Sequence, residues 1–189
     1  MTPKRFFDSD GGAFPCTVLD DRAGVRHAKG CYTLAPEKRK VARLAADTFA
    51  AVRANAEEGE RRMAAGDYRG AFELFVAAHD LLPEPRERWN AAGWLRVALG
   101  ENAIRAGSFH AAEGPLADAM WCPGTIGNPW VHLRCGQMRF ELGQMERAGD
   151  ELARAYMGGG RAIFEGQDPK YFALVEQLLR PPPGMDRLP

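Results

Sequence analysis

The feature of this chain that most constrains its fold is one residue spacing that occurs three times. Each copy opens with a glycine, has a second glycine seven residues later, and continues with alanines and large apolar residues at matching offsets. The opening glycines are Gly59, Gly100 and Gly136. The residues that follow them are Gly66, Ala71, Phe75 and Ala78; Gly107, Ala112, Leu116 and Ala119; and Gly143, Ala148, Leu152 and Ala155. Small residues recur where two helices must touch and large ones where they interdigitate, so the pattern predicts stacked helical hairpins.

The predicted fold is an all-α solenoid of about three helical hairpins, in a repeat domain that spans residues 36–189. A last helix is expected near residues 168–180. Asp168 is a suitable N-cap for it, Pro169 fits its first turn, and an apolar run follows until the prolines at 181–183 stop it. This helix would cap the open end of the stack.

Residues 1–35 differ from the rest because they are rich in glycine, aspartate and proline and lack a helical period. Two alternatives are open for this N-terminal extension. Residues 14–19 and 25–34 contain valine, threonine and tyrosine and flank a group of turn-forming residues, which favours a short β-hairpin. The other alternative is an arm without regular structure.

The composition excludes some classes of partner. Basic and acidic residues balance at 25 each, which removes the long-range attraction to nucleic acid or to an anionic membrane. No run of about 20 apolar residues is present, and the first residues lack the apolar core of a signal peptide. We therefore expect a cytoplasmic protein that binds neither nucleic acid nor membranes.

The cysteines do not have the spacing of a metal site. Cys16, Cys31, Cys122 and Cys135 are far apart in sequence, and a chain with no export signal is expected to keep them as free thiols. Cys16 and Cys31, with His27 nearby, would still need a further ligand from a distant segment to hold zinc. We expect no metal site.

No catalytic motif is recognisable either. A phosphate-binding loop, a His-Glu-x-x-His pair and a serine at a nucleophile elbow are all absent from the sequence. The histidines, at positions 27, 79, 110 and 132, each stand alone. Only His132, beside Trp130 and Arg134, is kept as a candidate for a role in a site. We expect a protein that is not an enzyme and needs no cofactor.

The repeated residues between about 52 and 160 resemble the tetratricopeptide repeat family, most specifically in the first copy. Gly93 lies 34 residues after Gly59, which is that family's period, and this suggests a longer helix over residues 85–106. The resemblance implies that the first helix of each pair lines a concave surface. The side chains then expected to be exposed there are Arg53, Glu60, Met63, Trp94, Val97, Glu101, Arg105, Trp130, Leu133, Gln137 and Glu141.

These positions predict the chemistry of a partner. Family members that clamp a peptide carboxylate use lysine and asparagine there, and this chain does not. The glutamates at 60, 101 and 141 with Trp94 and Trp130 suit a partner that presents basic and apolar groups. The alternative is that the two tryptophans fill the interior between helices.

Residues 127–137, 150–160 and 168–172 are also similar to small helical-repeat immunity proteins of bacterial polymorphic toxins. This second resemblance implies a protein that binds one folded partner, a toxin domain with a basic or mixed surface, and occludes its active site. A scaffold or chaperone-like adaptor that binds extended peptides is the first alternative. A small enzyme on a helical scaffold is the second.

Overall fold

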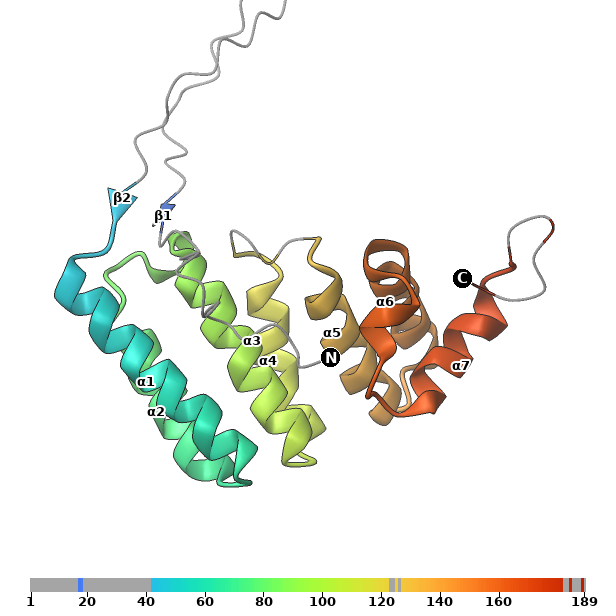
Figure 1. Cartoon of the computed structure of the whole chain (residues 1–189), viewed down its shortest axis with the longest axis horizontal. Helices are drawn as coiled ribbons and strands as arrows, with labels where there is room; N and C mark the ends of the chain where they lie inside the picture. Colours follow the sequence, from blue (N-terminus) through green and yellow to red (C-terminus); the bar gives the residue numbers. More distant parts are fainter. Residues whose placement is uncertain are drawn as a thin grey trace, which may run out of the picture.

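The structure, a computed structural model, describes residues 17–18, 42–122, 125, 127–181, 184 and 188. This part of the chain is almost entirely helical (Figure 1). Its α-helices are α1 (Ala46–Ala64), α2 (Tyr68–Asp80), α3 (Asn90–Arg105), α4 (Phe109–Ala119), α5 (Pro129–Glu141), α6 (Met145–Gly159) and α7 (Pro169–Leu178). Two short 3-10 helices are η1 (Arg86–Arg88) and η2 (Arg161–Phe164). The predicted all-α fold is confirmed.

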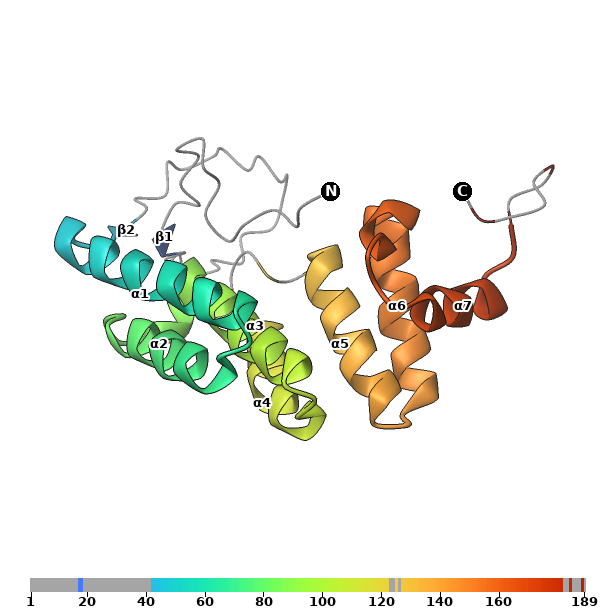
Figure 2. The same cartoon turned by 60° about the horizontal axis from the view of Figure 1, so that its bottom comes forward.

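The helices form three antiparallel hairpins that follow one another along the long axis of the molecule, with α7 at the end (Figures 1 and 2). The pairs are α1 with α2, α3 with α4 and α5 with α6, and the second helix of each pair also packs on the first helix of the next. In the described residues α3 further contacts α5, and α5 contacts α7, whereas the second helices touch one another little or not at all. Helices α3 and α5 therefore lie on the inner side of the curve.

Each hairpin is closed by the same contact between a glycine and a large apolar side chain. A Cβ on Gly59, Gly100 or Gly136 would meet the side chain that lies 16 residues later, which is Phe75, Leu116 or Leu152. The alanines of the pattern are buried between the helices: Ala71, Ala78, Ala112, Ala119, Ala148 and Ala155. The turn glycines at 66, 107 and 143 all have positive φ, a conformation that favours glycine. The repeat spacing thus sets both the turns and the helix contacts.

The second hairpin corrects the expectation of a longer helix over residues 85–106, since α3 begins at Asn90. Gly100 occupies the place of Gly59, as the repeated spacing predicts, whereas Gly93 packs against Cys122 and Thr125. Helix α3 is accordingly no longer than α1. The connection from α2, residues 81–89, is as long as the one from α4, residues 120–128. At its end the Trp89 indole donates a hydrogen bond of 2.9 Å to the Pro83 carbonyl.

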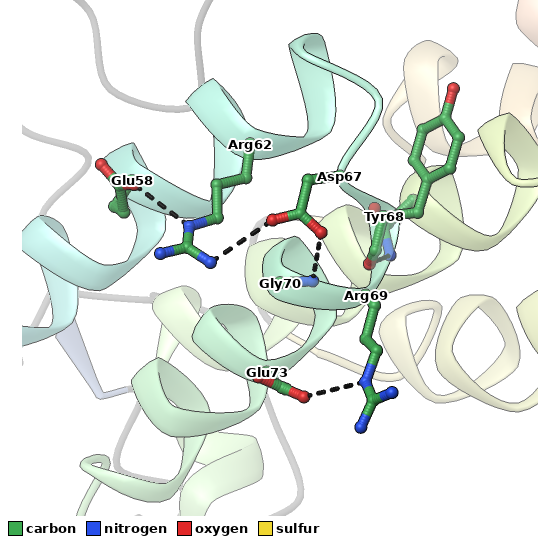
Figure 3. Close-up of polar contacts among 8 residues, drawn as sticks. Glu58, Arg62, Asp67, Tyr68, Arg69, Gly70 and Glu73 are labelled. Atoms are coloured by element: carbon green, nitrogen blue, oxygen red, sulfur yellow. Dashed lines mark hydrogen bonds and ion pairs between the residues drawn. The ribbon is translucent and has the colours of Figure 1, made fainter.

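The first turn is held by polar contacts that Figure 3 shows in close-up. Asp67 caps α2 and accepts a hydrogen bond of 2.9 Å from the Gly70 amide. Arg62, near the end of α1, lies 3.3 Å from the same carboxylate and 3.2 Å from that of Glu58. The aspartate after the turn glycine therefore joins the two helices of the hairpin.

The two ends of the described chain differ. At the beginning, β1 (Thr17–Val18) pairs antiparallel with β2 (Ala42–Arg43), and residues 25–34, the predicted second strand, lie outside the described residues. The predicted domain boundary at residue 35 lies outside them too and stays a prediction. At the other end, Asp168 caps α7 as expected, and Leu188 packs into the apolar cluster that contains Tyr171 and Phe172.

Candidate protein-binding face

The candidate binding surface lies on the side of the first helices that is turned away from the second helices. On each first helix the opening glycine faces the second helix. The positions six residues before it and five residues after it lie about 120° and 140° around the helix axis, so they point away from the second helix. We call this surface the inner face. Its solvent-accessible members among the predicted residues are Arg53, Glu60, Trp94, Arg105, Trp130 and Glu141.

The expectation that all the inner positions are exposed is wrong. Glu101 is only 4% exposed and Gln137 only 2%, although both are polar. The apolar members of the predicted set are buried as well: Met63, Val97 and Leu133. The two polar side chains are covered because α3 packs on α5 and α5 on α7. The three apolar side chains belong to clusters that include residues from the second helix of their own hairpin.

Glu101 and Gln137 belong to a polar network that the repeat pattern does not predict. Its centre is Arg134 of α5, whose side chain donates a hydrogen bond of 3.0 Å to Glu101 of α3. The same guanidinium donates to the Gln137 side chain at 2.7 Å and to that of Gln167 at 3.2 Å. Gln137 in turn donates to Gln167 at 2.8 Å. Since Gln167 lies in the turn between η2 and α7, the network joins three successive parts of the solenoid.

The surroundings of Arg134 are apolar as well as ionic. The residue is 6% exposed, and its guanidinium carbon lies 4.2 Å from the centre of the Trp130 ring, a cation–π geometry. Burial lowers the pKa of Arg134 and the nearby Arg105 lowers it further, while Glu101 opposes both. Arginine stays charged under these conditions. Glu101 is thus the counter-ion of a buried cation.

A second group of charges lies at the other end of α5. The Tyr171 hydroxyl donates a hydrogen bond of 2.7 Å to the Glu141 carboxylate, and the Lys170 ammonium lies 2.7 Å from it. Burial by itself raises the pKa of Glu141, but the hydrogen bonds from Lys170 and Tyr171 outweigh it, so the net pKa is lowered. Glu141 is therefore an ionised group that is already paired within the chain.

The predicted acidic character of the inner face is consequently reduced. Glu101 pairs with Arg105 as well as with Arg134, Glu141 pairs with Lys170, and Arg53 pairs with Glu57 at 2.7 Å. Trp94 and Trp130 are half-buried and pack against one apolar cluster, which includes Val97 of α3 and Val131 of α5. Both tryptophans thus fill the interior in part and contribute accessible aromatic surface in part.

The other candidate groups do not converge on one place. His132 and Arg139 of α5 both contact Glu151 of α6, at 2.6 Å and 2.7 Å, inside the third hairpin. His79 and His110 lie in α2 and α4, and His27 is outside the described residues. The described residues contain no group of three or more histidine, cysteine, aspartate or glutamate side chains placed to hold a metal ion. Within the same residues, no helix combines the length and the apolar character needed to span a bilayer.

The buried thiols of Cys122 and Cys135 are expected to be unreactive in the folded protein. Burial raises the pKa of Cys122, and it raises that of Cys135 to about 12. With Cys16 and Cys31 replaced by serine, Ellman's reagent at pH 8 should not label the native protein but should label both remaining thiols in urea. Rapid labelling of the native protein would contradict this burial.

The raised pKa of Cys135 also makes stability depend on pH. The contribution of this thiol to the free energy of unfolding is fully present below its ordinary pKa of 9.0 and should be lost as pH rises towards 12.

Comparison with solved structures places this geometry among known folds. The structure is similar to that of SycD, a type III secretion chaperone of Yersinia enterocolitica, in a crystal structure with a peptide of the translocator YopD. The TM-score is 0.55 at 15% sequence identity, over 71% of this chain and 94% of that one. The fold is a tetratricopeptide-like solenoid. No family model matches the sequence, and neither does any curated protein.

Proposed function

We propose that this chain is a noncatalytic, chaperone-like adaptor that holds an extended segment of a partner protein on its inner face. The observation that carries this proposal is the similarity to SycD over nearly the whole of that chain, since SycD is a chaperone that was crystallised with a bound peptide. A fold supports many functions, so the chemistry of the face has to be argued separately.

The inner face suits a segment with apolar and neutral side chains. Its charges at Arg53, Arg105 and Glu141 are already paired within the chain, so a strongly charged partner would have to displace existing ion pairs. Half-buried tryptophans are frequent anchors of binding because they offer a large contact area that a partner can finish desolvating. Trp94 and Trp130 supply such anchors on adjacent hairpins.

The immunity-protein hypothesis is the second candidate, and it has no support from the comparisons. The two proposals differ in the form of the partner, since an adaptor accepts short unfolded segments and an immunity protein requires a folded toxin domain. A displayed library of random 12-residue peptides distinguishes them. Enrichment of apolar sequences with micromolar affinity supports the adaptor. Failure of every peptide, together with tight binding to a folded product of a neighbouring gene, would favour the immunity protein instead.

Truncation of an inner-face tryptophan is expected to weaken peptide binding. Trp94→Ala should raise the Kd for an enriched peptide about tenfold, because a partly desolvated aromatic anchor is lost. Fluorescence anisotropy with a labelled peptide measures the change. The matched control is Phe72→Ala in α2, an aromatic that is 52% exposed on a second helix. Equal losses for the two variants would place the peptide elsewhere.

A further inference from the structure

One buried arginine connects the last three elements of the inner side. Arg134 of α5 reaches Glu101 of α3 in the preceding hairpin and Gln167 of the turn before the last helix. Its remaining contacts, with Gln137 and with the Trp130 ring, lie within its own helix and hold the guanidinium in place. A single rigid group therefore touches three parts of the solenoid that are otherwise held together mostly by apolar packing.

The two kinds of contact constrain geometry differently. Apolar packing between stacked hairpins is not directional, so it tolerates small rotations of one hairpin on the next. A guanidinium is planar and presents its donors in a fixed arrangement, so hydrogen bonds at 2.7–3.2 Å fix the orientation of the groups it joins. At the first junction a polar link between neutral groups runs from the Asn102 side chain to the Tyr68 carbonyl.

We infer that Arg134 is a positioning residue that sets the curvature of the inner face. It fixes the angle of α3 to α5 through Glu101, and it fixes α5 to the turn that leads into the last helix through Gln167. The consequence for peptide binding rests on the proposed function, because a surface held in its binding shape loses less entropy when a ligand binds. The effect on shape belongs to the free protein and is independent of any ligand.

The experiment measures that shape without a partner. Spin labels are attached at two exposed alanines, through Ala54→Cys in α1 and Ala173→Cys in α7, in a chain with Cys16 and Cys31 changed to serine. The native Cys122 and Cys135 are buried and remain unlabelled. Double electron–electron resonance then gives the distribution of distances between the two ends. Arg134→Met is expected to shift and broaden this distribution relative to the parent.

Two matched arginine variants distinguish an effect on curvature from the effect of losing any ion pair. Arg105→Met removes a partner of the same Glu101 carboxylate, but the bond lies within α3. Arg139→Met removes a bond to Glu151 that lies within the third hairpin. Both controls should leave the distance distribution unchanged. A distribution for Arg134→Met that matches the parent, or that matches both controls, overturns the inference.

A second variant keeps the test decisive if Arg134→Met does not fold. Gln167→Ala removes the link from α5 to the last helix while the Arg134–Glu101 pair remains. It is expected to broaden the same distance distribution, and an unchanged distribution would overturn the inference. Adding a library-selected peptide separates the two proposals. If Arg134→Met changes the distance distribution but the parent protein binds no peptide, the proposed function is rejected and the role of Arg134 stands.

Discussion

Replacement of Glu101 by methionine is expected to lower the free energy of unfolding by about 3–5 kcal/mol, the usual cost of leaving a buried charge without its partner. The reason is that Arg134 is 6% exposed and has no other carboxylate within bonding distance among the described residues. Its bonds to Gln137 and Gln167 are to neutral oxygens and do not compensate a full charge. Urea denaturation followed by circular dichroism measures the loss.

The other arginine of the pair provides the control. Arg105 bonds the same Glu101 oxygen at 2.8 Å, but its side chain is 42% exposed and regains water when the partner is removed. Arg105→Met should therefore cost no more than about 1 kcal/mol. Arg134→Met should cost less than Glu101→Met, because Glu101 then keeps Arg105 as its counter-ion.

The double variant tests the same explanation, because the stability losses of the two single substitutions should not add. Glu101→Met with Arg134→Met removes both buried charges and leaves Gln137 and Gln167 bonded to each other. It should be more stable than Glu101→Met alone, because apolar replacements of a whole buried pair are often neutral. A double variant that is less stable than Glu101→Met would show that Arg134 stabilises the fold mainly through contacts other than the ion pair.

The hairpins were predictable from sequence because each is defined by contacts within about 20 residues. Gly136 and Leu152 lie on two helices joined by one tight turn, so their pairing depends only on helix geometry and on the turn at Gly143. Connections between hairpins are not constrained in this way. Gly93 lies one family period after Gly59, but its contacts with Cys122 and Thr125 place it outside the contact that closes a hairpin, which Gly100 makes with Leu116.

The chemistry of the inner face was less predictable because it depends on how one hairpin meets the next. The repeat pattern describes each first helix as if it stood alone, and it therefore predicts that Glu101 and Gln137 are exposed to solvent. A signal was present in the repeat itself, since Arg134 is two residues before one opening glycine and Glu101 one residue after the preceding one. These positions share a helix face, so opposite charges there indicate a bond between neighbours. Gln167 carries no such signal, because it lies outside the repeats.

Gly136→Ala is expected to lower the free energy of unfolding by about 2–3 kcal/mol, near the upper end of the usual cost of overpacking. A Cβ at this position would lie 2.6 Å from the Leu152 Cγ and 3.1 Å from its backbone nitrogen. Leu152 is fully buried, so neither its branch point nor its backbone has space to move. The two helices of the third hairpin would have to separate, which thermal or urea denaturation would detect.

Gly149→Ala in α6 is the matched control for this argument. Both glycines are buried and helical, and a Cβ on Gly149 would also make a close contact, at 2.4 Å. The atom that it meets is the terminal Cδ1 of Leu178, a side chain that is itself exposed and free to rotate away. Replacing a helical glycine by alanine otherwise favours the folded state by about 0.5–1 kcal/mol. Gly149→Ala should therefore be neutral or slightly stabilising. If both variants lose equal stability, loss of glycine itself, and not the close approach of α5 and α6, would account for the effect.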